Sequence, residues 1–307
     1  MDLALLVLPV FLTILCGYGL AVSGGLPADQ WTGVEVMSFR LLIPAVLIGA
    51  IAESDLEMSR YGPLIAMLVL TLVILAVLLF LLRFLLPDTV MDAPSFTTLF
   101  QAGTRWNGFI ALALAEQIAG DEGILMIAVI MAFLIPLINI VNIIMLSAYG
   151  PGETSVKVIA MTILKNPLVQ ACAIGLTLSI SGLSIPGPIA QSLDFIGRAA
   201  LGVGLLAVGA GITFRRLLRA GILVWVGLVL RPVLTPVIFI ALGHFIGLEP
   251  LQLLIGAMVM AVPAAANGYI IARRMGGNAG LYADIMTWQA IAGMLVLPGL
   301  LYLLPLN

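Results

Sequence analysis

Long apolar segments, separated by short polar joints, follow one another along the whole chain. Because about 20 apolar residues in a helix cross a bilayer, this pattern predicts ten membrane-spanning helices. The predicted spans are residues 3–23, 36–54, 62–86, 96–119, 123–148, 158–181, 190–213, 220–246, 250–274 and 279–305. The joints are rich in Gly, Pro, Asp and Ser, as in residues 23–27, 150–152 and 181–186. The pattern therefore predicts an all-α integral membrane protein.

The composition supports a membrane protein without an appended soluble domain. Hydrophobic residues make up 62% of the 307 residues, charged residues 9%, and the mean hydropathy is +1.22, whereas soluble domains carry far more charge. The chain starts with an apolar run that lacks a basic region and a small-residue cleavage site, which predicts a first membrane helix and not a signal peptide. Cys16 and Cys172 each lie in an apolar segment, which favours two buried thiols over a disulfide.

Four motifs of the first half recur in the second half, in the same order and at offsets of 158, 159, 160 and 160 residues. Each half, 1–148 and 158–307, contains five predicted spans, so the second half must enter the membrane from the opposite side. Such an inverted repeat is typical of secondary transporters, whose binding site lies near the midplane. The recurring pairs are Pro9–Gly17 with Pro167–Gly175, Leu26-Pro27 with Ile185-Pro186, Ile48–Ala50 with Val208–Ala210, and Asn107–Ile110 with Asn267–Ile270.

The basic residues predict the orientation of the chain in the membrane. Nine of them fall on one side of the predicted spans, and the opposite side has Arg60 and Arg198. Because cytoplasmic joints are rich in Lys and Arg, the nine mark the cytoplasmic side, and both termini are predicted on the outer face. The nine are Arg40, Arg83, Lys157, Lys165, Arg215, Arg216, Arg219, Arg273 and Arg274.

The ninth predicted span is interrupted by the sequence 262–268. Pro263 has no amide hydrogen and its ring crowds the preceding turn, and Gly268 loosens the backbone further. A break in the membrane is tolerated only beside protein or a water-filled cavity. The half-helix starting near Ala264 would direct the positive end of its dipole to the midplane, where an anion could bind.

The fourth predicted span has no proline, but Gly103, Thr104 and Gly108 flank Arg105 and Asn107. If the repeat holds, Asn107 and its repeat equivalent Asn267 lie on two opposed broken helices, and their side-chain amides approach each other. Arg105 adds a positive charge whose planar fork suits a carboxylate. The predicted substrate-binding residues are Arg105, Asn107, Gly108, Asn267 and Gly268, and the predicted helix-break residues are Gly103, Thr104 and Pro263.

Structural alternatives stay open for each of these residues. A membrane asparagine can simply bond a neighbouring helix, and a proline can simply kink one. Arg105 could form a structural ion pair with Glu116 or Asp284. Asp284, near the start of the last span, is also the candidate for a proton carrier, with an ion pair to Arg273 or Arg274 as its alternative.

Four further polar residues have weaker assignments. Arg231, followed by Pro232, is expected to snorkel or to pair at a kink. Gln101 and Gln289 are possible amides lining the site, and Asn142 is expected to join helices.

Motifs of enzymes are absent from the sequence. It has no zinc-protease motif, no cluster of cysteine and histidine, no phosphate-binding loop and no nucleophile paired with a base. We therefore expect no enzyme activity, no metal and no cofactor, and transport driven by gradients. The sequence has no basic segment with interspersed aromatic residues, so we expect no nucleic-acid partner.

At this point the chain resembles the auxin efflux carrier family, which includes plant PIN-FORMED proteins and bacterial carriers. The resemblance runs over essentially the whole chain and depends on the order of loose motifs. These motifs are Leu8–Phe11, Gly17–Gly19, Leu42–Ala45, Arg105–Phe109, Lys165–Pro167, Leu206–Ala210 and Val262–Asn267.

The resemblance implies ten helices in two inverted five-helix repeats, with crossed, broken helices 4 and 9, elevator-type alternating access and a homodimer. It implies that Asn107, Pro263 and Asn267 frame a carboxylate site, although the fourth span lacks the family's proline. By repeat logic, spans 1, 2, 6 and 7 form a scaffold domain and spans 3–5 and 8–10 a transport domain.

We therefore expect a secondary transporter in the inner membrane for a small organic anion, such as a dicarboxylate or an auxin-like acid. Its expected partners are the carboxylate, membrane lipid and a second copy of the chain. Two alternatives remain: a sodium-coupled symporter of the bile acid type, and a membrane sensor with this fold that does not transport.

Overall fold

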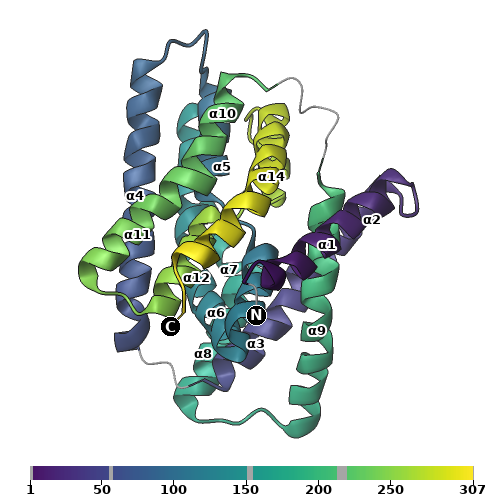
Figure 1. Cartoon of the computed structure of the whole chain (residues 1–307). Coiled ribbons are helices and arrows are strands. Elements are labelled where there is room, and N and C mark those ends of the chain that lie inside the picture. The colour runs from purple at the N-terminus through teal and green to yellow at the C-terminus, as the bar shows by residue number, and fades with distance from the viewer. Residues whose placement is uncertain (1–2, 55–57, 151–154, 213–219, 307) are drawn as a thin grey trace. The chain divides into compact units, whose positions relative to one another are not determined.

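The computed structural model describes residues 3–54, 58–150, 155–212 and 220–306, which form helices joined by short non-helical segments and contain no strand (Figure 1). The helices are α1 (Leu3–Val22), α2 (Ala28–Met37), η1 (Ser38–Leu42), α3 (Ile43–Ala52), α4 (Met58–Leu85), α5 (Ala93–Thr104), α6 (Gly108–Tyr149), α7 (Val156–Leu164), α8 (Pro167–Ser181), α9 (Gly187–Ala210), α10 (Ile222–Val229), η3 (Leu230–Leu234), α11 (Thr235–Ile246), α12 (Pro250–Ala261), α13 (Asn267–Arg274) and α14 (Ala279–Leu303). The segments η1 and η3 are short π-helices. The all-helical fold class is confirmed.

Apolar helices long enough to cross a membrane recur through the described residues. Six such runs are present: 29–52, 59–85, 93–149, 187–210, 222–246 and 279–303. Shorter apolar helices cover 6–22, 167–181 and 250–261. Predicted spans 4 and 5 both fall in 93–149, which turns at Gly120, where φ is 54° and ψ is −133°. The chain is a multi-pass membrane protein, and its ten-span inverted repeat stays a prediction.

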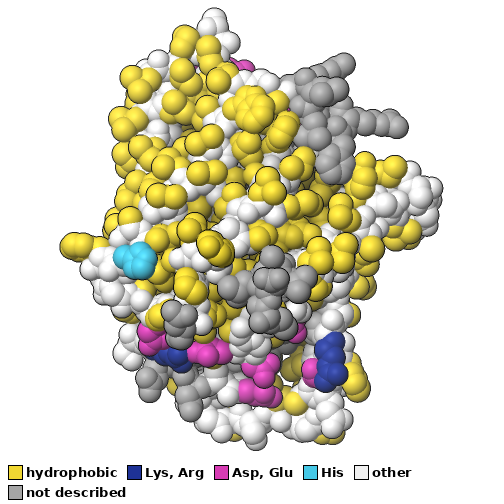
Figure 2. Space-filling model, viewed as in Figure 1, with side chains coloured by type: hydrophobic (Ala, Val, Ile, Leu, Met, Phe, Trp, Pro, Cys, Tyr) yellow, Lys and Arg dark blue, Asp and Glu magenta, His cyan; other side chains and the backbone are white. Residues whose placement is uncertain are grey.

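The surface agrees with a lipid environment. Figure 2 shows apolar side chains over most of the face in view, and long apolar residues such as Phe84, Val237 and Phe245 are exposed on the helices α4 and α11. Large exposed apolar areas of this kind are uncommon on soluble monomers. The predicted cytoplasmic arginines 215, 216 and 219, and joint residues 151–152, lie outside the described residues.

The chain divides into two compact units. The first unit consists of Met1–Tyr61, Gly108–Pro136 and Ala160–Gly211, and the second of Gly62–Asn107, Leu137–Ile159 and Ile212–Asn307. Because α5 belongs to the second unit and the segment from Gly108 to the first, the chain passes from one unit to the other directly after Asn107.

Within the first unit, α1 packs on α9, and α3 packs on α8 and α9. Glycine allows the first contact, since a Cβ at Gly17 would overlap the backbone of Leu206 and one at Gly209 the backbone of Ile14. Small residues of this kind let membrane helices approach closely.

The two thiols differ, since Cys16 is exposed and Cys172 is buried. The prediction of two buried thiols is therefore wrong for Cys16, whose place on the outer side of α1 could not be read from the apolar segment around it.

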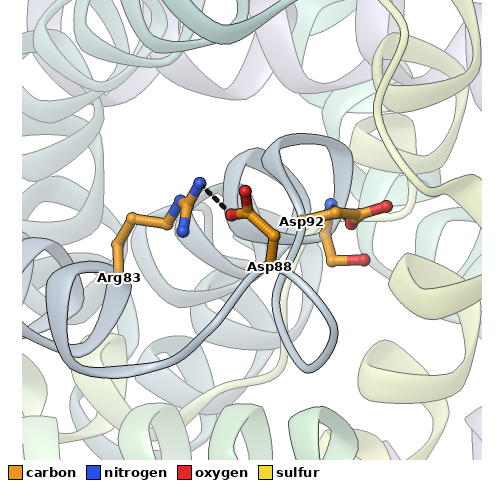
Figure 3. Close-up of polar contacts among 4 residues, drawn as sticks. Arg83, Asp88 and Asp92 are labelled. Atoms are coloured by element: carbon orange, nitrogen blue, oxygen red, sulfur yellow. Dashed lines mark hydrogen bonds and ion pairs between the residues drawn. The ribbon is translucent and has the colours of Figure 1, made fainter.

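Within the second unit, the corner between α4 and α5 fixes where α5 starts (Figure 3). The Nη2 of Arg83 bonds Oδ1 of Asp88 at 2.6 Å across the corner. The carboxylate of Asp92 then accepts the N–H of Ser95 at 2.9 Å and caps the helix, with Pro94 in its first turn. An acidic N-cap followed by proline is a strong local signal for a helix start.

Candidate functional site

Two interrupted helices meet in the second unit. The helix α5 ends at Thr104 and is followed by three non-helical residues, 105–107, while α12 ends at Ala261 and is followed by the non-helical residues 262–266. Arg105 and Val262, the first residues of the two breaks, share an extended backbone with ψ of 147°. The N–H of Asn107 donates to the carbonyl of Pro263 at 2.8 Å, so the two breaks are joined directly.

The second break follows from its proline. A residue before proline is pushed out of the helical region, as the extended Val262 shows. The first break forms without a proline. There, the Oγ1 of Thr104 donates to the carbonyl of Phe100 at 2.8 Å, and the Nδ2 of Asn142 donates to Thr104 Oγ1 at 2.9 Å. Asn142 thus joins α6 to the end of α5, as predicted for it.

Each broken helix leaves carbonyl groups without a partner in its own last turn. In α5, the carbonyl of Gly103 accepts from Arg231 Nη1 at 2.7 Å, and that of Ala102 accepts from Gln289 Nε2 at 3.3 Å. Both donors come from distant parts of the chain, so tertiary contacts stabilise the helix end.

The last turn of α12 is satisfied in the same way. The carbonyl of Val259 accepts from Arg231 Nη2 at 2.7 Å, and that of Val262 accepts from Arg231 Nε at 3.0 Å. The Oγ1 of Thr235 donates to the carbonyl of Met260 at 3.1 Å. Arg231 is 0% exposed. The expectation that Arg231 snorkels is therefore wrong, because its guanidinium caps both broken helices instead of reaching the membrane surface.

Two side chains of α14 hold the backbone of the second break. Gln289 Oε1 accepts the N–H of Ala264 at 2.9 Å, and the hydroxyl of Tyr282 donates to the carbonyl of Ala265 at 2.6 Å. Gln289 therefore contacts the break, and its assignment as an amide that lines a substrate site stays a prediction. Sequence reasoning missed Tyr282, for which an aromatic residue on an apolar helix gave no signal.

The two glycines among the predicted binding residues have packing roles. A Cβ at Gly268 would overlap the ring of Tyr282, and one at Gly108 would lie 2.6 Å from Cε of Met131. Gly268 lets α13 approach α14, and Gly108 lets the start of α6 approach a later turn of the same unit. A Cβ at Gly103 would lie 3.4 Å from Leu75 and Leu79 of α4.

Arg105 lies in the first break and is only 6% exposed. Its Nε is buried without a hydrogen-bond partner in the part of the chain that the structure describes. The ion pairs found among those residues join Arg60 to Glu122, Arg83 to Asp88 and Arg198 to Asp194. The described residues therefore offer Arg105 no structural ion pair, which was the alternative to a substrate role.

Other polar groups around the breaks are also unsatisfied. Gln101 is 0% exposed, and neither its Oε1 nor its Nε2 has a hydrogen-bond partner among the described residues. The Oδ1 of Asn267 is also buried without a hydrogen-bond partner among the described residues. Buried polar groups without partners are rare and costly, and each calls for an explanation. A polar ligand would supply the missing partners.

The two buried arginines are in different electrostatic surroundings. Arg231 faces the C-terminal ends of α5 and α12, each of which carries roughly half a negative charge through the helix dipole. These two ends together compensate one guanidinium. Among the described residues, Arg105 takes part in no ion pair, and its Nε has no hydrogen-bond partner. Asp284 lies on α14, two residues after Tyr282, and its assignment as a proton carrier stays a prediction.

A comparison with families of known proteins matches the second half of the chain. Residues 152–301 match the model of a family described as membrane transport protein. Over these residues, the match confirms the resemblance to the auxin efflux carrier, or PIN-like, family. No curated protein matches the chain.

Proposed function

Because residues 152–301 belong to a family of membrane transporters, we propose that this chain is a secondary transporter for a small organic anion with a carboxylate group. The observation on which this depends is Arg105, a buried guanidinium without an ion pair among the described residues, located where the two broken helices join. A family of transporters also agrees with the absence of enzyme motifs in the sequence.

The anion follows from the energetics of Arg105. An isolated charge in an apolar interior costs several kcal/mol, and removing its partner from a buried pair is strongly unfavourable. A carboxylate would pair with the guanidinium through two parallel hydrogen bonds. The amides of Gln101, Asn107 and Asn267 would orient the rest of the substrate. Because Arg105 is a single positive charge without an ion pair among the described residues, we expect the site to bind one carboxylate group tightly.

The division into two units supports alternating access of the elevator type. The second unit contains both breaks and predicted spans 3 and 8–10, and the first unit contains predicted spans 1, 2, 6 and 7. Apart from residues 108–136, which group with the first unit, these memberships are compatible with the proposed transport and scaffold domains, which stay a prediction. We propose that the unit with the breaks moves and carries Arg105 with it.

The setting of the transporter is part of the proposal. The distribution of basic residues supports an inner-membrane protein with both termini on the outer side. The auxin efflux carrier resemblance supports a homodimer, and a gradient of the substrate or of an ion would drive transport.

The test is carboxylate binding by the purified protein. In a thermal-shift screen, a carboxylate that binds the folded state raises the unfolding temperature by mass action. We expect Arg105→Gln to abolish this shift, because the substitution removes the charge while keeping a polar side chain. Arg83→Gln is the matched control, since it removes an arginine that is paired with Asp88 in the same unit. Equal binding by the Arg105→Gln protein and the control would refute the assignment.

Counterflow in liposomes distinguishes transport from the alternatives. A transporter exchanges labelled for unlabelled carboxylate across the membrane, whereas a sensor with the same fold binds the ligand and shows no exchange. A sodium-coupled symporter would require sodium for both binding and exchange.

A further inference from the structure

Arg231 is a fully buried guanidinium whose hydrogen bonds, among the described residues, all go to backbone carbonyl groups. Its three donor nitrogens each bond a carbonyl oxygen: Nη1 bonds Gly103 at 2.7 Å, Nη2 bonds Val259 at 2.7 Å and Nε bonds Val262 at 3.0 Å. The side chain itself is 0% exposed, and it takes part in none of the ion pairs of the described residues. One cation therefore links the ends of two broken helices.

The local sequence explains how the side chain reaches this position. Pro232 has no N–H to give to the preceding turn, and the helix widens there into η3 between α10 and α11. The hydroxyl of Thr235 bonds the carbonyls of Arg231 and Met260, which fixes η3 against α12. π-Helical turns of this kind are frequent at functional sites.

The carbonyl oxygens around Arg231 have the chemistry of a cation site. In transporters with broken helices, unwound carbonyls and the C-terminal ends of half-helices coordinate the coupling ion. Here Gly103 and Val259 lie in the last turns of α5 and α12, and Val262 lies in the unwound segment. All three oxygens are bonded by the guanidinium, which carries the same single positive charge as sodium.

We propose that Arg231 is a built-in cation that occupies the position of a coupling ion at the two helix breaks. The fold of the crossing is then complete without a bound metal ion, and substrate binding is independent of sodium. The charge at this position stays in place through the transport cycle, because it is covalently attached to η3. The statement about the transport cycle rests on the proposed function, whereas the statement that Arg231 occupies a cation site does not.

The experiment compares Arg231→Ala, Arg231→Met and Arg231→Lys with the wild-type full chain in detergent. Thermal unfolding is followed in sodium chloride, lithium chloride and N-methylglucamine chloride at equal ionic strength, and with millimolar ethylguanidinium chloride added. Arg105→Ala is the matched control, because it removes the other buried arginine of the crossing, which bonds no carbonyl of α12 through its side chain.

We expect the wild type to unfold at the same temperature with all three cations. Arg231→Ala and Arg231→Met should unfold several degrees lower in N-methylglucamine, and sodium, lithium or ethylguanidinium should restore at least half of that loss by filling the vacated carbonyl site. Arg105→Ala should lose carboxylate binding and show no response to small cations.

Three results would overturn the proposal: a wild type that needs sodium for its stability, neutral Arg231 variants that respond to no small cation, and neutral variants as stable as the wild type. If the neutral variants do not fold, Arg231→Lys decides, because it keeps the charge. A lysine variant that folds and is indifferent to sodium supports the proposal, and one that fails like the neutral variants contradicts it.

The carboxylate screen keeps this inference separate from the proposed function. A wild type that binds a carboxylate only with sodium contradicts the built-in cation alone. A wild type that binds no carboxylate, together with cation-responsive Arg231 variants, contradicts the proposed function alone.

Discussion

At the scale of single residues, the crossing shows how two buried arginines of one unit take different roles. Arg231 is satisfied by three carbonyl oxygens, while the Nε of Arg105 has no partner among the described residues. The same charge therefore bonds the backbone in one case, and in the other it is the group that we propose binds the substrate. Each arginine stands in an apolar span, and their different roles follow from their tertiary partners.

The two asparagines of the repeat give a direct prediction for binding. We expect Asn107→Ala and Asn267→Ala each to weaken carboxylate binding by roughly 10-fold, about the effect of one hydrogen bond to a charged group. Isothermal titration of the purified variants measures this loss. Asn278→Ala serves as the control, because Asn278 caps α14 by accepting from Leu281 N at 3.0 Å. It should lower stability by about 1 kcal/mol and leave binding unchanged, and unchanged binding in both site variants would remove the asparagines from the site.

Replacing Gln101 with leucine should raise the free energy of unfolding and lower the affinity for a carboxylate. Because its buried amide has no partner among the described residues, Gln101→Leu should raise the free energy of unfolding by about 1–3 kcal/mol. The same substitution should lower carboxylate affinity if the amide contacts the substrate. Gln289→Leu is the contrast, since Gln289 bonds Ala264, Ala102 and Gly227 and its loss should destabilise the fold. A Gln101→Leu protein that is more stable and binds normally would show that the amide does not contact the ligand.

At the scale of elements, the two breaks show what sequence predicts well. The proline at 263 predicted the second break, and the observed interruption at 262–266 includes it. Glycine and polar residues around 105 predicted the first break despite the missing proline, and residues 105–107 are non-helical. The partners that hold the breaks could not be predicted, because Arg231 bonds a carbonyl 128 residues away and Gln289 one 187 residues away. No local spacing encodes such contacts.

The approach of α13 to α14 depends on Gly268, which gives a prediction for these two helices. Gly268→Ala should lower the free energy of unfolding by about 1–3 kcal/mol through overpacking against Tyr282, although alanine favours helices more than glycine. Gly299→Ala is the control on α14, since no heavy atom lies within 4 Å of its added Cβ. Denaturation of Gly268→Ala, Tyr282→Leu and the double variant measures the coupling. If the two losses simply add, the overlap with Tyr282 is not the cause.

At the scale of the whole molecule, the sequence repeat has a counterpart in the packing of the first unit. The α1–α9 contact joins predicted spans 1 and 7, and the α3–α8 contact joins predicted spans 2 and 6. Because span 1 is equivalent to span 6 and span 2 to span 7 in the repeat, each of these two contacts is the repeat equivalent of the other. Glycines at the matched positions 17 and 175 lie in both of them, because a Cβ at Gly175 would meet Ile51 of α3 at 2.8 Å. Pseudo-symmetric contacts of this kind are what two inverted halves would form, and they give the repeat physical support beyond the offset of its motifs.

The inverted repeat makes a topological prediction that its matched joints can test. The joints at 23–27 and 181–186 are equivalent in the repeat, yet an odd number of spans separates them, so they should lie on opposite sides of the membrane. In a background of Cys16→Ser and Cys172→Ser, we expect Ser184→Cys to react with a membrane-impermeant maleimide in right-side-out spheroplasts. Ser23→Cys should react only after permeabilisation, because the positive-inside distribution places its joint in the cytoplasm. Both serines are exposed, so accessibility alone does not separate them. Labelling of both from the same side would exclude the inverted arrangement. The proposed binding site at the joined breaks would still be decided by the tests of Arg105 and the asparagines.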